Sequence, residues 1–200
     1  MALWLLPQPL VLASQSAARR TMLLAAGIPI EVVPAALDER EVSEQAGNAR
    51  AVAPLLAREK ALAVAGQLPG RLVLGADQTL LLGEQQFTKP ADRAAAREQL
   101  RALRGRDHEL HSAVGIARDK AVLFEHGEAA RLTMRAFTDD FLERYLDAAG
   151  TAVTQSVGGY QVERLGIQLF ERVEGDHFTI LGLPLLALLQ FFRREGWLAG

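Results

Sequence analysis

The sequence predicts an α/β protein with a mixed β-sheet. In the first half of the chain, short apolar runs typical of buried strands alternate with segments of helical periodicity, and in the second half the apolar runs cluster. Half of the 200 residues are hydrophobic, which suits one compact domain or two small lobes that share a core. Alternating helices and strands favour parallel pairing and clustered strands favour antiparallel pairing, so we expect both in one sheet.

The N-terminal part predicts a strand, a helix and a second strand. Residues 9–13 are a short apolar run, and residues 17–26 are good helix formers that end before Gly27. Residues 28–33 are rich in β-branched side chains, which predicts the second strand, and a polar segment at residues 37–41 and a loop follow it.

The next elements are a helix and a long strand. Residues 51–65 have helical periodicity and close at Gly66. Residues 72–82 predict one long strand that is broken at a functional bend around residues 75–78, with a turn near Gly83.

Residues 92–104 predict an amphipathic helix, with Ala95, Leu100 and Leu103 near its buried side and Gly105 as its cap.

The remaining elements are a meander, a helix, a turn and a final helix. The meander is predicted at residues 110–117, 122–125 and 130–136, and the helix that follows is capped by Thr138 and runs to about residue 148. Residues 158–162 and 167–173 flank the turn, and residues 182–184 open the final helix within the apolar residues 180–192.

Composition excludes several classes of protein. The 22 basic and 24 acidic residues give a formal charge of -2 without long runs of one sign, so we expect neither a nucleic acid nor a membrane as partner. The absence of cysteine excludes disulfides and thiolate nucleophiles. The apolar residues 1–13 differ from a signal peptide because no basic residue precedes Arg19. The apolar residues 180–192 are too few to span a membrane. We therefore expect a cytoplasmic protein.

The turn after the first predicted strand is a candidate anion site. The sequence has no P-loop, dinucleotide fingerprint, His-Glu-x-x-His or Gly-x-Ser-x-Gly motif. A helix start offers free N–H groups, Ser14 and Ser16 add hydroxyls, and Arg19 or Arg20 adds a guanidinium suited to phosphate. The alternative is a capped helix with two solvated arginines.

Lysine is rare in a chain that favours arginine. Only Lys60, Lys89 and Lys120 occur, and Lys60 lies in an otherwise apolar-faced helix while Lys89 precedes Pro90 at a loop-to-helix junction. A compact ammonium at either position could reach a ligand, and ordinary surface lysines are the alternative.

Asp77 is the strongest acid candidate because it follows an apolar strand and a small Gly-Ala pair. A carboxylate there can bind a hard metal ion or take a proton from water, and Glu39 could be a second metal ligand. A turn-capping Asp77 and a solvated Glu39 are the alternatives. The four histidines at positions 108, 111, 126 and 177 lack the spacing of a zinc site.

These segments, taken in order, resemble the Maf family of nucleoside triphosphate pyrophosphatases. Ser14-Gln15-Ser16-Ala17-Ala18-Arg19-Arg20 is similar to the family's Ser-x-Ser-Pro-Arg-Arg loop, and further similar segments lie at residues 56–61, 75–78, 89–90, 158–160, 170–175 and 182–185. The resemblance spans nearly the whole chain. It implies a Maf/ITPase-like elongated mixed β-sheet flanked by helices, with two lobes around a central cleft, in a single domain over residues 1–200.

The resemblance also implies a function and a set of site residues. The function is metal-assisted hydrolysis of a nucleoside triphosphate to the monophosphate and pyrophosphate, in a house-cleaning role in nucleotide metabolism, with Mg²⁺, Mn²⁺ or another divalent cation as cofactor. Asp77 is the implied general base, Glu39 and Asp77 are the implied metal ligands, and Lys60 completes the catalytic set. The implied substrate-binding residues are Ser14, Ser16, Arg19, Lys89, Gln78 and Glu163. A homodimer stays open.

Gln78 and Glu163 resemble the branch of the family that acts on 7-methyl-GTP, whereas the dTTP and UTP branch has Thr and Gln at these positions. A carboxylate can accept hydrogen bonds from the N1–H and 2-amino groups of guanine. However, that branch usually has Trp at the position of Ala18, so the preferred base stays open.

The main alternative is a nucleotide-binding regulator of cell division or septum formation whose catalysis is weak or secondary. The intact set of Asp77, Lys60 and Lys89 favours the enzyme. A nucleic-acid-binding module is disfavoured by the charge balance and by the lack of aromatic residues interleaved with basic ones.

Overall fold

The computed structural model describes residues 2–200, which divide into two compact units. The first unit contains the residues up to Gln78, Ser112–Glu128 and His177–Gly200. The second contains Thr79–His111 and Ala129–Asp176.

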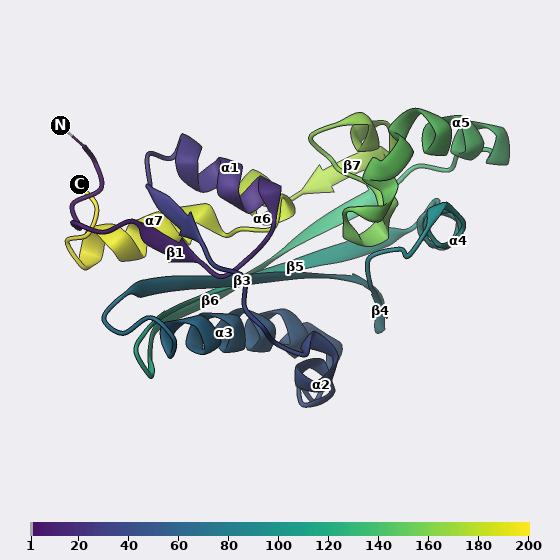
Figure 1. The fold of residues 1–200 in the computed structure, drawn as a ribbon. Helices are drawn as coiled ribbons and strands as arrows, with labels where there is room; N and C mark the ends of the chain where they lie inside the picture. Colours follow the sequence, from purple (N-terminus) through teal and green to yellow (C-terminus); the bar gives the residue numbers. More distant parts are fainter. Residues whose placement is uncertain (1) are drawn as a thin grey trace. The chain divides into compact units, whose positions relative to one another are not determined.

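The strands form one seven-stranded sheet with the order β2-β1-β3-β5-β6-β7, and β4 pairs with β3 (Figure 1). The strands are β1 (Leu10–Leu12), β2 (Ile30–Val32), β3 (Leu72–Leu82), β4 (Gln85–Phe87), β5 (Asp107–Arg118), β6 (Ala121–Met134) and β7 (Phe170–Glu174). Strand β1 pairs in parallel with β2 and β3, whereas the β3–β4 and β6–β7 pairs are antiparallel. The predicted mixed sheet with flanking helices is confirmed.

In the first unit, helices cover both faces of the sheet. They are α1 (Ala17–Ala25), α2 (Glu39–Glu44), the 3₁₀ turn η1 (Ala49–Ala51), α3 (Val52–Ala65), α6 (His177–Ile180) and α7 (Leu185–Arg194). Figure 1 shows α1 and α7 on one face and α3 on the other. The side chains alternate accordingly along β1: Leu10 and Leu12 pack in the core with α1 and α7, and Val11 packs in the core with α3, as does Ala13 just after the strand.

Helix α3 lies directly against the sheet because glycines face it. A Cβ atom at Gly75 would lie 2.1 Å from the carbonyl oxygen of Ala57 and 2.6 Å from the nitrogen of Ala61. A Cβ atom at Gly115 would lie 3.2 Å from the same Ala57 oxygen. At Gly75 only a residue without a side chain permits this close approach, which sets the height of Lys60 above β3.

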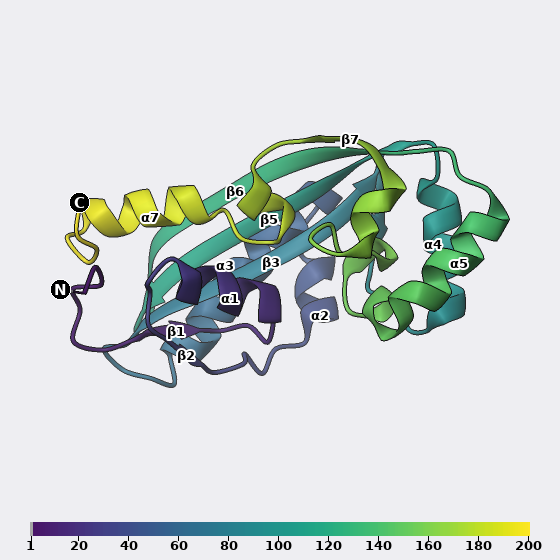
Figure 2. The same ribbon diagram turned by 90° about the horizontal axis from the view of Figure 1, so that it is seen from above.

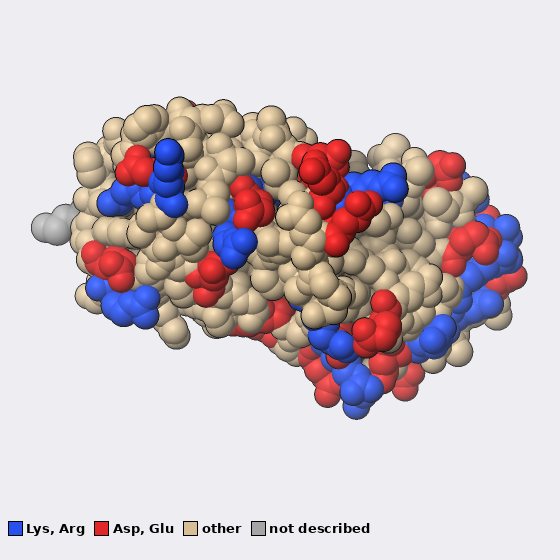
Figure 3. All heavy atoms as spheres, turned by 90° about the horizontal axis from the view of Figure 1, so that it is seen from below, with Lys and Arg blue, Asp and Glu red and all other residues tan. Residues whose placement is uncertain are grey.

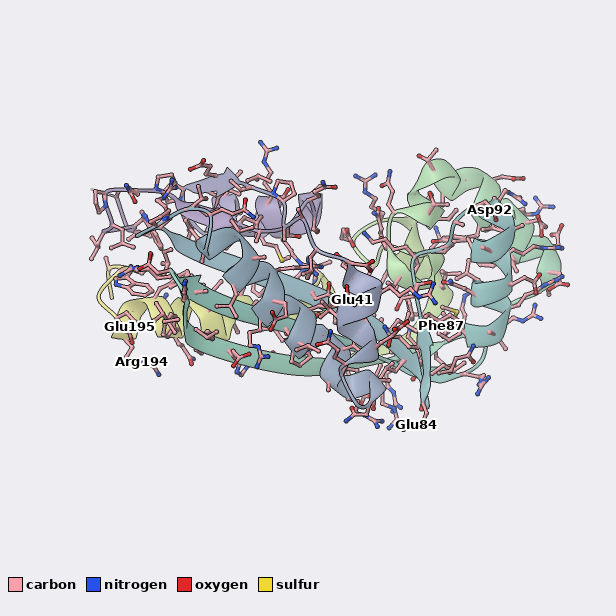
Figure 4. The ribbon with its side chains drawn as sticks, turned by 60° about the horizontal axis from the view of Figure 1, so that its bottom comes forward. Glu41, Glu84, Phe87, Asp92, Arg194 and Glu195 are labelled. Carbon is pink, nitrogen blue, oxygen red and sulfur yellow. The ribbon has the colours of Figure 1, made fainter. Side chains whose placement is uncertain are left out.

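The second unit contains α4 (Arg93–Leu103), α5 (Asp139–Ala149) and the 3₁₀ turns η2 (Gly150–Thr154), η3 (Val157–Gly159) and η4 (Leu165–Leu169). Helices α4 and α5 lie side by side (Figure 2). Ion pairs of Arg93 with Asp147, at 2.6 Å, and of Arg101 with Asp139, at 2.7 Å, join them. Asp92, labelled in Figure 4, caps α4 by accepting a hydrogen bond from the nitrogen of Ala95.

Most predicted elements are confirmed. The N-terminal strand, helix and strand correspond to β1, α1 and β2, and the later helices correspond to α3, α4, α5 and α7. Gly27 and Gly105 follow α1 and α4 with positive φ, at 75° and 69°. These conformations explain why glycine ends both helices.

Three local predictions are wrong. Residues 39–44 form α2 rather than a loop, because Asp38 caps the helix by accepting hydrogen bonds from the nitrogens of Arg40 and Glu41. Strand β3 continues through residues 75–78 without the predicted break, and the predicted three-stranded meander is the two long strands β5 and β6. On α4, the predicted Leu100 and Leu103 are buried and Ala95 is partly buried beside the buried Ala96.

The surface carries interspersed charges. On the face in Figure 3, Lys and Arg side chains lie beside Asp and Glu side chains, consistent with the formal charge of -2. Among residues 2–200, no helix has the length and apolar character needed to cross a membrane.

Candidate functional site

The candidate site of the first unit lies where its parallel strands end. Strand β1 lies between β2 and β3, with Leu12 paired to Val32 on one side and to Leu74 on the other. The chain passes from β1 to β2 through α1 and from β2 to β3 through α3, so the strand order reverses beside β1 and the two helices cover opposite faces. In open α/β sheets such a reversal is the usual place for a ligand, outside the carboxyl ends of the strands.

Ser14 and Ser16 shape the turn that follows β1. The hydroxyl oxygen of Ser16 accepts a hydrogen bond from the nitrogen of Arg19 at 3.4 Å and caps α1. The hydroxyl oxygen of Ser14 accepts from the nitrogen of Ser16 at 3.3 Å and from Nη1 of Arg19 at 3.0 Å. The predicted turn thus brings both serines to Arg19.

The guanidinium of Arg19 is buried and held along one edge. Nε donates to the carbonyl oxygen of Gly182 at 2.8 Å, and Nη1 donates to the carbonyl oxygen of Ala76 at 2.8 Å. Burial lowers the pKa of Arg19, while the charges of Asp77 and Glu39 oppose that shift. Within the described chain, Nη2 makes no hydrogen bond to another residue.

The two arginines of the turn have different environments. Arg19 is 8% exposed, whereas Arg20 lies exposed on α1. Of the two candidates that the sequence left open, the structure places Arg19 beside the strand ends.

Lys60 lies between two carboxylates. Its Nζ is 2.7 Å from Oδ1 of Asp77 and 2.7 Å from Oε1 of Glu39. The side chains of Lys60 and Asp77 are 10% and 12% exposed, whereas that of Glu39 is 59% exposed. The cluster therefore has a buried ion pair with a third, solvent-facing partner.

The positions of these three residues follow from the fold. Asp77 lies two residues after Gly75 on β3 and so points to the same face, toward α3. Lys60 is next to Ala61, which lies against Gly75. Glu39 is the first residue of α2, which packs against α3.

The carboxylates of Asp77 and Glu39 suit a hard divalent cation only in part. Within residues 2–200, no group of three or more His, Cys, Asp or Glu side chains could hold a metal ion. Mg²⁺ commonly binds through one or two carboxylates, with phosphate oxygens and water as its other ligands. The pair is compatible with that mode of binding and lacks the ligands of an all-protein cage.

Gln78 points to the opposite face of β3. Its Nε2 lies 2.9 Å from Oγ of Ser112 and within 3.2 Å of the carbonyl oxygens of Thr179 and Ile180. The side-chain amide nitrogen of Gln78 therefore makes its hydrogen bonds to residues of the first unit. Sequence reasoning missed Ser112 and Thr179, although each is a polar residue inside an apolar segment.

Lys89 and Glu163 belong to the second unit. Lys89 is exposed in the loop after β4, and Glu163 is exposed in the turn before η4. That both bind substrate stays a prediction.

The histidines make local contacts. The ring of His108 is buried, with Nε2 2.7 Å from the hydroxyl oxygen of Tyr160, and burial lowers its pKa to about 4. Nε2 of His111 lies 2.8 Å from Glu109, and Nε2 of His126 lies 2.8 Å from Glu128.

This arrangement defines an α/β protein with a candidate anion site at a reversal of strand order, formed by one arginine, one lysine and two carboxylates. Residues 9–195 match the model of the Maf-like protein family. The chain belongs to this family, as its motifs predicted.

Several relatives are similar over their whole length. A nucleoside triphosphate pyrophosphatase of Rhodopseudomonas palustris strain BisB18 is 58% identical, with all of both chains covered. Proteins of the same name from Bradyrhizobium diazoefficiens and Paramagnetospirillum magneticum are 55% and 53% identical, covering 100% and 93% of this chain and 100% and 98% of their own. Among solved structures, a HAM1 protein of Coxiella burnetii has a TM-score of 0.43 and 18% identity, covering 63% of this chain and 72% of its own.

Proposed function

We propose that this protein hydrolyses a nucleoside triphosphate to the monophosphate and pyrophosphate. Relatives that are 53% to 58% identical over nearly their full length carry the name of this activity. The observation that carries the proposal is the Lys60 ammonium held between Asp77 and Glu39 in the unit that also holds Arg19 at the end of β1. Such a set can supply a proton acceptor and the positive charge that a triphosphate needs.

In the proposed reaction, water attacks the α-phosphorus and the bond to the bridging oxygen of the β-phosphate breaks. Asp77 takes the proton of the water, and pyrophosphate leaves with the electron pair of the broken bond. The unbonded Nη2 edge of Arg19 and the hydroxyl of Ser14 bind phosphate oxygens. The ammonium of Lys60 exchanges its contact with the exposed Glu39 for a phosphate oxygen.

Glu39 and Asp77 would hold Mg²⁺ or Mn²⁺ together with phosphate oxygens. A bound cation would supply positive charge that stabilises the leaving pyrophosphate. Lys60 now occupies the space between these carboxylates, so cation binding requires its ammonium to move toward the phosphates.

The proposed substrate has a guanine-type base, and 7-methyl-GTP is one candidate. Glu163 is exposed and can accept hydrogen bonds from a base. Ala18 has no ring to stack on a purine, so the proposal rests on hydrogen bonding rather than on stacking.

A release assay tests this function. Pyrophosphate and monophosphate are measured over a panel of canonical and modified triphosphates with Mg²⁺, Mn²⁺ or EDTA. We expect metal-dependent release of pyrophosphate from at least one triphosphate. Nucleotide binding without release would instead support the nucleotide-binding regulator.

A further inference from the structure

Helix α6 is a four-residue turn that side chains from three strands hold in place. These side chains are Gln78 of β3, Ser112 of β5 and Glu128 of β6. A helix of this length is unstable by itself, so tertiary contacts must set its position.

Thr179 is the point where these contacts meet. It is fully buried, and its carbonyl oxygen accepts hydrogen bonds from Oγ of Ser112 at 2.7 Å and from Nε2 of Gln78 at 3.2 Å. Its hydroxyl donates to Oε2 of Glu128 at 2.6 Å. A buried hydroxyl bonded to a carboxylate is a strong, directional contact.

Thr179 is hydrogen-bonded directly to Gly182, which in turn contacts Arg19. The nitrogen of Gly182 donates to the carbonyl oxygen of Thr179 at 3.0 Å, and the carbonyl oxygen of Gly182 accepts from Nε of Arg19 at 2.8 Å. Helices α1 and α6 lie on the same face of the sheet (Figure 1). Glu128 is therefore connected to the guanidinium through two residues.

Gly182 also lies beside the Nη2 edge of that guanidinium. Its φ is 97°, and a Cβ atom here would lie 3.6 Å from Nη2 of Arg19. A shift of Gly182 would remove the acceptor that fixes Nε and turn the Nη2 edge away from its present direction.

The Glu128 carboxylate is fixed at both oxygens, because Oε1 lies 2.8 Å from Nε2 of His126. It makes no hydrogen bond or ion pair with Arg19, Lys60 or Asp77 in the described chain. Its link to the candidate site thus runs through Thr179.

We propose that Glu128 is a positioning residue for the triphosphate site: through Thr179 and Gly182 it holds the Arg19 guanidinium in the orientation that binds phosphate. The inference rests on the proposed function, and it adds residues that touch no substrate. Its loss weakens nucleotide binding while the charge of Arg19 stays in place.

The test measures affinity for an α,β-methylene triphosphate, which cannot release pyrophosphate, by calorimetry. Glu128→Ala and Thr179→Val, which replaces the hydroxyl with a methyl group, are expected to weaken binding about tenfold, the order of one charge-assisted hydrogen bond. Glu128→Gln keeps an acceptor and is expected to bind within about twofold of the unchanged protein. Glu125→Ala, an exposed residue on the same strand, is the matched control and is expected to have no effect.

A double-mutant cycle with Arg19→Lys separates positioning from general destabilisation. In the Arg19→Lys background, Glu128→Ala should have little further effect, because the oriented guanidinium is already absent. Three results overturn the inference. They are an equal loss of affinity from Glu128→Ala in both backgrounds, a loss of affinity in Glu128→Gln as large as in Glu128→Ala, and normal affinity of Thr179→Val. The unchanged protein could also bind the nucleotide, with non-additive effects of the two substitutions, and release no pyrophosphate. That result would count against the proposed function and not against the role of Glu128.

Discussion

The Nζ of Lys60 lies 2.7 Å from Oδ1 of Asp77, with both side chains almost fully buried. Lys60 lies on α3 and Asp77 lies on β3, the next element along the chain. The glycine at position 75 allows this helix and this strand to pack closely enough for the contact. The same contact links the stability of the first unit to its proposed chemistry, because removing either partner leaves the other charge buried.

Lys60→Met is expected to destabilise the protein by about 3–5 kcal/mol, because Asp77 loses its buried cation. The free energy of unfolding in urea measures this loss. Lys120→Met, at an exposed turn, should stay within about 0.5 kcal/mol. A Lys60→Met variant as stable as the Lys120→Met control would show that the pair contributes nothing to folding.

Gly75→Ala is expected to cost about 3 kcal/mol, because the new Cβ would lie 2.1 Å from the carbonyl oxygen of Ala57 and push α3 from the sheet. Gly66→Ala is the control. Its φ is -64° and its Cβ would lie 3.4 Å from the nearest atom, an ordinary contact. Urea unfolding of both variants should give a large loss for Gly75→Ala only, and equal stability would rule out the proposed close contact.

His108 is expected to make the protein less stable in acid. Its pKa is about 4 in the folded state against an ordinary value of 6.5, so the unfolded state binds its proton first as the pH falls. Stability from the neutral ring is complete above pH 6.5 and is lost between pH 6.5 and about pH 4, by about 3 kcal/mol.

Unfolding in urea at pH 7 and pH 4.5 tests the role of His108. His108→Gln has no ring to protonate, so it should be less stable at pH 7 and lose less stability than the unchanged protein on acidification. An identical pH dependence for both proteins would assign the acid sensitivity to other groups.

Glu163→Gln is expected to lower the preference for guanine-type triphosphates about tenfold, because an amide cannot accept both hydrogen bonds from the base edge. The measurement is the ratio of kcat/KM values for 7-methyl-GTP and UTP. Glu171→Gln, another exposed glutamate of the same unit, is the control. An unchanged ranking of substrates would remove Glu163 from base selection.

Local sequence signals predicted most elements but not the central contact. Apolar runs and terminal glycines identified β1, α1 and α3, and the position of Asp77 after a small Gly-Ala pair marked it as a candidate. The bridge of Lys60 to Asp77 and Glu39 was not predictable, because it depends on how closely α3 packs on the sheet.

Helix α2 was missed although a local signal was present. Asp38 is followed three residues later by Glu41, which is typical of a capped helix start. None of the residues of α2 is buried, so its apolar pattern was too weak to predict a helix. Its contacts with α3, including the ion pair of Glu39, place it in the fold.

Single-turnover release of pyrophosphate by Asp77→Asn tests the central claim most directly. If Asp77 accepts the proton of the attacking water, the rate should fall roughly 10²- to 10⁴-fold while an α,β-methylene triphosphate still binds. Glu41→Gln, on the exposed face of α2 (Figure 4), should release pyrophosphate at the unchanged rate. Release by Asp77→Asn at the rate of this control would contradict the account.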